Sequence, residues 1–327
     1  MLRVGIVGTG MISDSFVKAA HQLKEVEVVA VQSRTLESAE EFAHKNKIQK
    51  TYDDYDLMLK DDEINAVYIG LPNSLHFDYG IKALKAHKIT ILEKPFLSNM
   101  AEYDQLMALS IKTKTRVFEM SRVIQLPNFK NIQAHLKDIE PIRMITMNFS
   151  QYSRKYNDYL AGRILNVFSE KFSGGALVDL GVYSVHFLVG LFGVPQELTY
   201  IASLLPNTID VGGNLICRYD GFIASVVQSK NSKCDNRITI QGEKGTIYAS
   251  PTASALRKVE LDQTEKTDIT VTQDLEGMAY TLRDIANIVE TNDELAYQNR
   301  IEQSRRVMEV LCKARKSAGI VYEADHK

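Results

Sequence analysis

The first third of the chain alternates short apolar runs with longer segments whose apolar residues recur at helical spacing. The runs predict buried strands, and the spaced segments predict helices. The expected strands are Leu2–Val7, Val26–Val31, Ala66–Leu71, Ile89–Leu92 and Arg116–Met120, and the expected helices are Met11–Leu23, Ser38–Lys45, His76–His87 and Asn99–Lys112. Apolar strands that alternate with helices are typical of a parallel sheet covered on both faces. The pattern therefore predicts a doubly wound α/β domain over residues 1–122.

After about residue 122 the apolar runs become longer and alternate with polar residues or carry β-branched ones. The expected elements are a helix near Asn128–Lys137, a strand at Arg143–Tyr152, a helix at Gly175–Phe192, strands at Gly213–Tyr219, Ile223–Gln228, Arg237–Gln241 and Ile269–Thr272, and helices at about 275–291 and 299–318. The stretch from Tyr152 to Phe172 is polar and irregular, and Tyr-Asp-Gly (219–221) and Gly-Glu-Lys-Gly (242–245) are turn signals. We therefore expect a second, α+β domain over residues 123–327 with a large, mostly antiparallel open sheet.

Composition narrows the classes of function that the chain can have. Its 327 residues hold 39 Lys and Arg against 41 Asp and Glu, a formal net charge of −2, which argues against a nucleic-acid partner. The three cysteines, Cys217, Cys234 and Cys312, are far apart and form no CxxC pair, so neither a disulfide scaffold nor a metal site is expected. Reduced thiols fit the cytoplasm. No uninterrupted apolar run reaches the roughly 18 residues that a membrane span needs, so no membrane partner is expected.

A glycine turn follows the first predicted strand, in the order Gly8-Thr9-Gly10-Met11-Ile12-Ser13. The first glycine permits a tight turn, and the second lets backbone N–H groups approach a pyrophosphate at the helix N-terminus. Ser13 is small enough for the helix to pack close to the strand. This strand–turn–helix context predicts a Rossmann-type dinucleotide site at Gly8, Thr9, Gly10, Met11 and Ile12.

The end of the second predicted strand bears on which dinucleotide binds. An NAD site usually has an acid here that holds the ribose hydroxyls, but this chain reads Gln32-Ser33-Arg34-Thr35 and has no acid before Glu37. Hydroxyl groups and a guanidinium can bind a 2′-phosphate instead. Ser33, Arg34 and Thr35 therefore favour NADP, with NAD left open.

Two further strand ends carry polar residues, at Leu71-Pro72-Asn73-Ser74-Leu75-His76 and at Glu93-Lys94-Pro95. In an open parallel sheet, ligands bind beyond the carboxyl ends of the strands. A lysine directly after a buried strand is partly desolvated, which favours its neutral amine. Pro95 restricts Lys94 to an extended backbone, so the lysine side chain leaves the strand in a fixed direction.

These motifs, in this order, resemble the Gfo/Idh/MocA family of oxidoreductases. The carrying residues are the turn at residues 8–12, Pro72–His76, the family's Glu93-Lys94-Pro95 signature, and Gly174-Gly175-Ala176-Leu177-Val178-Asp179-Leu180-Gly181-Val182-Tyr183. Tyrosine at 183, where inositol dehydrogenase-like members carry histidine, sides with the glucose–fructose oxidoreductase and dihydrodiol dehydrogenase-like branch. Glu119 and Pro127 also resemble that branch. Ser173, where many members have a third glycine, and residues 120–125, which lack the usual aromatic residues, depart from it.

The resemblance implies roles for the residues of the first domain. Lys94 would contact the reacting hydroxyl or carbonyl group, and Glu93 would support the nicotinamide. Leu71, Pro72, Asn73 and His76 would line the cofactor pocket. The family often has a cis peptide bond between this lysine and the proline.

On the predicted helix of the second domain, Asp179, Tyr183 and His186 fall at i, i+4 and i+7, on one stripe. We expect Tyr183 to exchange the hydroxyl proton with the help of a neighbouring cation, for which Lys94 is the candidate. Asp179 would orient Lys94 or a substrate hydroxyl. Which of Lys94 and Tyr183 is the acid or base stays open. His186 and Arg163 are candidate substrate contacts, although a buried structural histidine and a solvated loop arginine are the alternatives.

The sequence therefore predicts an NAD(P)-dependent oxidoreductase that acts on a secondary alcohol or carbonyl of a sugar, polyol or diol. Two other functions stay open: a non-catalytic dinucleotide sensor on the same fold, and a reductase of a non-sugar carbonyl or imine. The predicted helices cover only part of the second sheet, and open apolar sheet faces usually bury themselves against a partner. Family members commonly pair in this way, which implies a homodimer or homotetramer through the C-terminal sheet.

Overall fold

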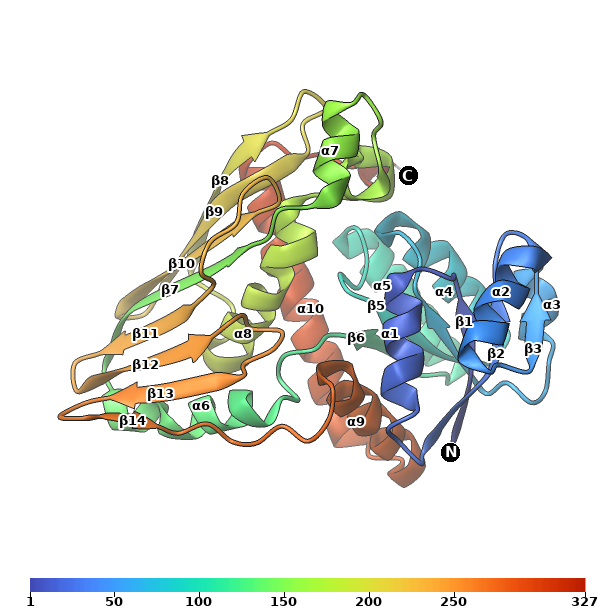
Figure 1. Cartoon of the computed structure of the whole chain (residues 1–327), viewed down its shortest axis with the longest axis horizontal. Coiled ribbons are helices and arrows are strands. Elements are labelled where there is room, and N and C mark those ends of the chain that lie inside the picture. Colours follow the sequence, from blue (N-terminus) through green and yellow to red (C-terminus); the bar gives the residue numbers. More distant parts are fainter. Residues whose placement is uncertain (327) are drawn as a thin grey trace. The chain divides into compact units, whose positions relative to one another are not determined.

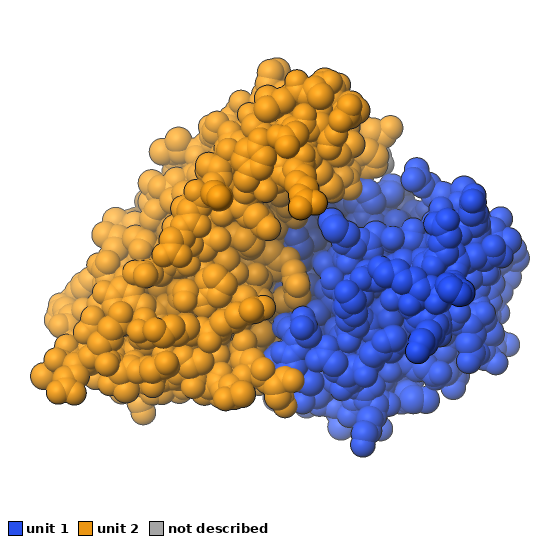
Figure 2. Space-filling model, viewed as in Figure 1, with its two compact units in different colours: residues 1–121, 275–302 blue, residues 122–274, 303–327 orange. Residues whose placement is uncertain are grey.

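The computed structural model describes residues 1–326, which form two compact units (Figure 2). Unit 1 comprises residues 1–121 and 275–302, and unit 2 comprises residues 122–274 and the segment from Gln303 onward. The structure thus groups 275–302 with the N-terminal unit, whereas the sequence pattern placed them in the second domain. As a division into domains, the boundary at residue 122 stays a prediction.

Unit 1 is built on a six-stranded sheet in the order β3-β2-β1-β4-β5-β6, with every neighbouring pair parallel (Figure 1). Its strands are β1 (Leu2–Val7), β2 (Val26–Gln32), β3 (Lys50–Tyr52), β4 (Ala66–Ile69), β5 (Ile89–Glu93) and β6 (Val117–Met120). Its helices are α1 (Met11–Ala20), α2 (Leu36–Asn46), α3 (Tyr55–Leu59), the 3₁₀ turn η1 (Asn73–Leu75), α4 (His76–Lys85), α5 (Met100–Thr113) and α9 (Gly277–Thr291). The predicted doubly wound parallel sheet is confirmed.

The strand order reverses at β1, and this reversal creates the binding edge of unit 1. Because crossover connections are right-handed, α1 after β1 and α4 after β4 lie on opposite faces of the sheet. Both faces are therefore covered, and β4 is buried along its whole length. On one face, the ring of Phe16 stacks on that of Tyr68 with 4.0 Å between centroids. The crevice beyond the carboxyl ends of β1 and β4 is where ligands bind in such sheets.

Unit 2 is built on an eight-stranded sheet in the order β14-β13-β12-β11-β7-β10-β9-β8, in which only β7 and β10 pair in parallel. Its strands are β7 (Ile142–Ser150), β8 (Glu197–Leu204), β9 (Asp210–Tyr219), β10 (Phe222–Ser229), β11 (Ile238–Gly242), β12 (Gly245–Ser250), β13 (Lys258–Asp262) and β14 (Lys266–Asp268). Its helices are α6 (Pro127–Ile139), α7 (Arg154–Leu160), the 3₁₀ turns η2 (Asn166–Phe168), η3 (Glu170–Phe172) and η5 (Glu323–His326), the π turn η4 (Leu177–Gly181) and α8 (Val182–Phe192). The predicted mostly antiparallel sheet is confirmed. The last position at which the chain passes from unit 1 to unit 2, after Glu302, falls within α10 (Glu294–Ser317).

Helices α6 and α8 pack on one face of the eight-stranded sheet (Figure 1). The strands alternate buried and exposed residues, as expected for a sheet with one covered face. The apolar residues exposed on these strands include Met144, Ile201, Ile216, Ile223 and Val227. An uncovered, partly apolar sheet face is the feature that the sequence pattern predicted.

Three predicted elements differ in the structure. The expected strand Ile269–Thr272 is wrong: β14 ends at Asp268, whose carboxylate accepts a hydrogen bond from the Thr270 amide at 2.9 Å and closes a turn. The stretch after Tyr152 was expected to be irregular but contains α7. The expected helix Gly175–Phe192 opens with a π turn rather than α-helical winding.

Within Glu170–Phe192, a window of 18 residues is apolar enough to cross a membrane, with a mean hydropathy of 1.6. However, 78% of that window is buried inside the protein. Such burial is typical of a core helix within a folded unit.

Candidate active site

The turn between β1 and α1 has the geometry that a pyrophosphate requires. Gly8 has φ +95°, and its amide donates to the Gln32 carbonyl at 2.9 Å, which joins the ends of β1 and β2. A Cβ at Gly8 would lie 3.0 Å from a Leu71 methyl group. A Cβ at Gly10 would meet nothing within 4 Å, so the outer side of the turn is open beside the N-terminal amides of α1. The residues of the turn fit a dinucleotide.

Packing beneath the turn explains the serine in place of a third glycine. Ser13 is fully buried, and a Cβ on Gly70 would lie 2.7 Å from its hydroxyl oxygen. Small residues at both positions therefore let α1 approach the end of β4.

Asp14, in the first turn of α1, forms ion pairs with Lys45 at 2.7 Å and with Lys18 at 3.2 Å. The hydrogen bond from Lys45 lowers the pKa of Asp14 most, and these two cations balance its charge near the anion-binding end of α1.

The residues predicted to select the dinucleotide lie beside this turn. The hydroxyl oxygens of Thr9 and Ser33 are 3.4 Å apart, so the first two loops of the sheet meet. Arg34 is exposed and forms no hydrogen bond or ion pair within the described part of the chain. Thr35 is the N-cap of α2 and accepts from the Ser38 amide at 3.3 Å. Ser33 and Arg34 are thus placed toward the surface, whereas the Thr35 hydroxyl already holds a helix end.

His76 ties two of the predicted cofactor loops together. It is fully buried; Nε2 lies 3.0 Å from the Leu71 carbonyl, and Nδ1 lies 3.1 Å from that of Pro95 and 3.3 Å from that of Phe96. Burial lowers the pKa of His76, which favours the neutral ring. The histidine therefore fixes the loops after β4 and β5 against each other, and its direct contact with a cofactor stays a prediction.

Lys94 directly follows the carboxyl end of β5, where hydrogen bonds of Glu93 hold the backbone in place. The Glu93 carboxylate accepts from the Tyr68 hydroxyl at 2.8 Å and from the Lys94 backbone amide at 3.1 Å. Glu93 is buried, Lys94 is half-buried, and the peptide bond from Lys94 to Pro95 is cis. The lysine thus stands at the same sheet edge as the glycine turn, together with the half-buried Leu71, Pro72 and Asn73.

Asp179 lies in the π turn of unit 2 and forms an ion pair with Lys230. Its carboxylate accepts a hydrogen bond from Lys230, which directly follows β10 and whose side chain is 7% exposed. The Asp179 side chain remains 35% exposed, so it faces solvent with its charge compensated. Sequence reasoning missed Lys230 because it follows a strand that alternates buried and exposed residues, and because Asp179 lies 51 positions away.

Tyr183 lies on the first turn of α8 and is held by a second cation that the sequence reasoning missed. Arg122 Nη2 donates to the Tyr183 hydroxyl oxygen at 2.8 Å, and the guanidinium carbon lies 5.5 Å from the ring centroid. The Phe149 ring packs 6.0 Å from the same centroid. We expected a cation beside Tyr183, with Lys94 as the candidate, and within unit 2 Arg122 is a cation in that place.

The glycine pair before the π turn is required by close packing. Gly175 has φ +131°, and a Cβ there would lie 2.1 Å from Asp210 Oδ1. The fully buried Asp210 accepts from the Leu177 amide at 2.7 Å and from the Tyr200 hydroxyl at 2.6 Å. Burial raises the pKa of Asp210 to about 6. A buried carboxylate therefore caps the start of the helical segment that carries Asp179 and Tyr183.

The two candidate substrate contacts lie in different environments. His186 is fully buried on α8, and its carbonyl accepts from Gln303 at 3.1 Å. The Arg163 side chain is 67% exposed and pairs with Asp158 of α7. Both stay predictions as substrate contacts. Within residues 1–326, no three His, Cys, Asp or Glu side chains gather as a metal site would require.

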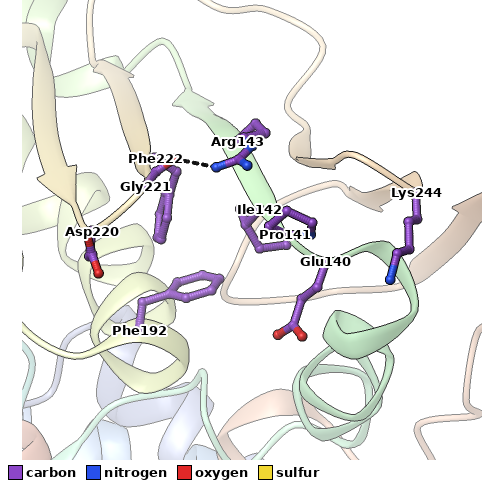
Figure 3. Close-up of a pocket in the computed structure, with 9 residues that line it drawn as sticks. All are labelled: Glu140, Pro141, Ile142, Arg143, Phe192, Asp220, Gly221, Phe222 and Lys244. Carbon is purple, nitrogen blue, oxygen red and sulfur yellow. Dashed lines mark hydrogen bonds between the residues drawn. The ribbon is translucent and has the colours of Figure 1, made fainter.

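A separate surface pocket of about 570 Å³ lies in unit 2 (Figure 3). It is lined by the start of β7, the β9–β10 hairpin and nearby side chains, namely Glu140, Pro141, Ile142, Arg143, Phe192, Asp220, Gly221, Phe222 and Lys244. Arg143 donates to the Gly221 carbonyl at 3.4 Å across it. None of the predicted site residues lines this pocket.

Comparison with known proteins matches two parts of the chain to family models. A model described as "Oxidoreductase family, NAD-binding Rossmann fold" matches residues 2–121, and the "GFO/IDH/MocA C-terminal domain" matches residues 137–248. Among curated relatives, the scyllo-inositol 2-dehydrogenase (NADP(+)) IolU of Bacillus subtilis is 33% identical, with 99% of each chain covered. The trans-1,2-dihydrobenzene-1,2-diol dehydrogenase of Xenopus tropicalis is 30% identical over 80% of this chain and 82% of that protein. The solved 3-ketoreductase KijD10 of Actinomadura kijaniata, with NADP and TDP-benzene, has a TM-score of 0.84 at 21% identity, with 97% of each chain covered.

Proposed function

The chain belongs to the Gfo/Idh/MocA family of oxidoreductases, with an N-terminal NAD-binding Rossmann fold, and from that premise we propose that it oxidises or reduces a secondary alcohol–ketone pair of a polyol, sugar or diol with NADP. The observation that carries the proposal is the open glycine turn at the same sheet edge as Lys94, which supports a dinucleotide and a reacting group side by side. The bound cofactor would supply or accept the hydride.

The cofactor would be held at the carboxyl ends of four strands of unit 1, β1, β2, β4 and β5. The Gly8–Ile12 turn would hold the pyrophosphate through backbone amides, and Leu71, Pro72, Asn73 and Glu93 would border the nicotinamide. Ser33 and Arg34 would bind the 2′-phosphate, which the exposed guanidinium favours. The names of IolU and of the KijD10 complexes, which print NADP, support the same choice.

We assign proton handling to Lys94, Asp179 and Tyr183. In the direction of reduction, a hydride reaches the carbonyl carbon while the Tyr183 hydroxyl gives its proton to the carbonyl oxygen, which leaves the tyrosine as a phenolate. To Lys94 of unit 1 we assign a hydrogen bond to the reacting group, and to Asp179 of unit 2, whose charge Lys230 compensates, the orientation of a substrate hydroxyl. Oxidation runs through the same atoms in reverse.

A cyclic polyol, or the ketone derived from it, is the substrate class that we favour. The full-length similarity to IolU supports it, since that relative is named for scyllo-inositol. The 35% exposed Asp179 carboxylate suits a substrate that carries several hydroxyl groups. His186 and Arg163 remain candidate contacts for such hydroxyls.

The uncovered face of the sheet of unit 2 is where we propose self-association. Ile223, on β10 near the middle of the sheet, is 44% exposed there, and Ile201, on the edge strand β8, is 65% exposed. Burial of apolar area of this kind against a second copy would give a homodimer or homotetramer.

The free cysteines Cys217, Cys234 and Cys312 support a reducing compartment, and we propose the cytoplasm.

Lys94→Ala tests the catalytic assignment most simply. Loss of the ammonium group should lower kcat by about 100- to 10,000-fold with NADP affinity nearly unchanged, because the lysine acts on the reacting oxygen. The assay follows reduced-nicotinamide absorbance across a panel of sugars, inositols, diols and their ketones. Lys24→Ala, at an exposed site in unit 1, is the matched control and should retain full turnover. Wild-type kcat in Lys94→Ala would contradict the assignment.

A further inference from the structure

We propose that Arg122 controls the protonation of Tyr183, so that the phenol of the reaction is tuned by a guanidinium from its own unit. The relevance of this control to catalysis rests on the proposed function, whereas the electrostatic coupling is a property of the protein alone. Arg122 acts through Tyr183 and is therefore a positioning residue for the reaction.

The contact is specific in its geometry. Arg122 lies between β6 and α6, and its Nη2 donates to the Tyr183 oxygen at 2.8 Å while the guanidinium carbon stays 5.5 Å from the ring centroid. Tyr183 is only 4% exposed, and Phe149 packs against its ring. Water therefore screens this bond less than it would at an exposed surface.

The chemistry of the two groups determines what the contact does. A guanidinium is a donor only, so the phenol oxygen must be the acceptor, and the phenol proton is left to point elsewhere. Once the phenol loses its proton, the same bond joins opposite charges and becomes stronger. Arg122 therefore stabilises the product of proton donation more than the starting phenol, which is the requirement for an interaction that promotes the step.

Other charged groups of unit 2 surround this phenol but have their own roles. Asp179 lies on the preceding turn, and Lys230, from the end of β10, compensates its charge. His186 follows one turn later on α8 and is fully buried. Arg122 is a cation of unit 2 that donates a hydrogen bond to the phenol oxygen.

The coupling can be measured without any substrate. Ring-fluorinated tyrosine is incorporated in place of the 15 tyrosines, and the fluorine resonance that disappears in Tyr183→Phe identifies Tyr183. The pH midpoint measured from this resonance should be higher in Arg122→Gln than in the wild type, because the hydrogen bond from a cation is lost. Arg122→Lys keeps the charge but loses the planar fork, so its midpoint should lie between those of wild type and Arg122→Gln. An unchanged midpoint in both variants would overturn the proposal.

A second readout connects the coupling to turnover. In the wild-type background, Arg122→Gln should lower kcat and shift its pH profile upward, whereas in the Tyr183→Phe background it should change kcat less than about twofold, because the coupling is already lost. Equal effects in both backgrounds would contradict action through Tyr183. If the resonance shifts but no substrate in the panel is turned over, the coupling stands and the proposed function fails.

Discussion

At the scale of single residues, the Asp179 and Tyr183 oxygens of unit 2, to which we assign proton handling, each have a cation as a hydrogen-bond partner. Lys230 pairs with Asp179, and Arg122 donates to Tyr183 at 2.8 Å. Both cations are at least half-buried, so desolvation strengthens their interactions with these oxygens. Each of these two oxygens therefore has a cation of its own unit as a hydrogen-bond partner.

Arg34 is the residue to which we assign the choice between NADP and NAD. Its guanidinium is exposed beside Ser33 and has no partner among residues 1–326. Arg34→Ala should lower kcat/KM for NADPH by about 10- to 100-fold through loss of a charge-assisted hydrogen bond. The value for NADH should change little. Parallel assays with the two cofactors test this, and equal losses for both would show that Arg34 does not bind the 2′-phosphate.

Sequence reasoning selected Lys94, Asp179 and Tyr183 as candidates because each lies within a short motif, and their roles stay predictions. It missed Arg122 and Lys230 because their partners lie 61 and 51 positions away, and only folding brings such residues together. It also could not show that the Thr35 hydroxyl caps α2, since the same residue type serves caps and ligands equally well.

At the scale of elements, the segment that carries Asp179 and Tyr183 is held at its start by Asp210. The carboxylate accepts from the Leu177 amide, and the neighbouring Gly175 leaves room for it. The π turn then widens the winding just where Asp179 projects, a distortion that often marks functional sites. Cap and π turn together fix the direction in which Asp179 leaves the helix.

The buried cap predicts a pH dependence of stability. Because the pKa of Asp210 rises from 3.8 to about 6 on folding, the native state holds its proton more tightly than the unfolded state. This contribution is therefore full below about pH 4 and is lost as the pH rises to about 6. Asp210→Asn should remove that decline in the free energy of unfolding, measured by urea denaturation across this range. Asp220→Asn, at an exposed turn, is the control and should keep it.

An identical pH decline in wild type and Asp210→Asn would contradict this role of the cap.

The helices and strands themselves were largely predictable from the sequence, because buried strands and amphipathic helices follow from local periodicity. The failure at Ile269–Thr272 has a physical cause: side chains take the backbone groups that a strand would pair. Asn131 donates to the Ile269 carbonyl at 2.6 Å, and Asn128 donates to that of Val271 at 2.9 Å.

At the scale of the whole molecule, the chain combines a dinucleotide-binding unit and a unit with an open sheet. The parallel order in unit 1 and the mostly antiparallel order in unit 2 were both predictable from strand length and alternation. The assignment of residues 275–302 to unit 1 was not, because it depends on packing between segments that are distant in sequence. Family membership rests on both units, since one model matches each of them.

Transfer of an isotope label tests the central claim, hydride exchange with a nicotinamide, most directly. The protein is incubated with NADPH deuterated at the nicotinamide C4 and with ketones of the inositol, sugar and diol panel, and the products are analysed by mass spectrometry. We predict one deuterium on the carbinol carbon of the product in the wild-type reaction and a large loss of labelled product in Lys94→Ala. Tight NADPH binding without label transfer to any member of the panel would contradict the account.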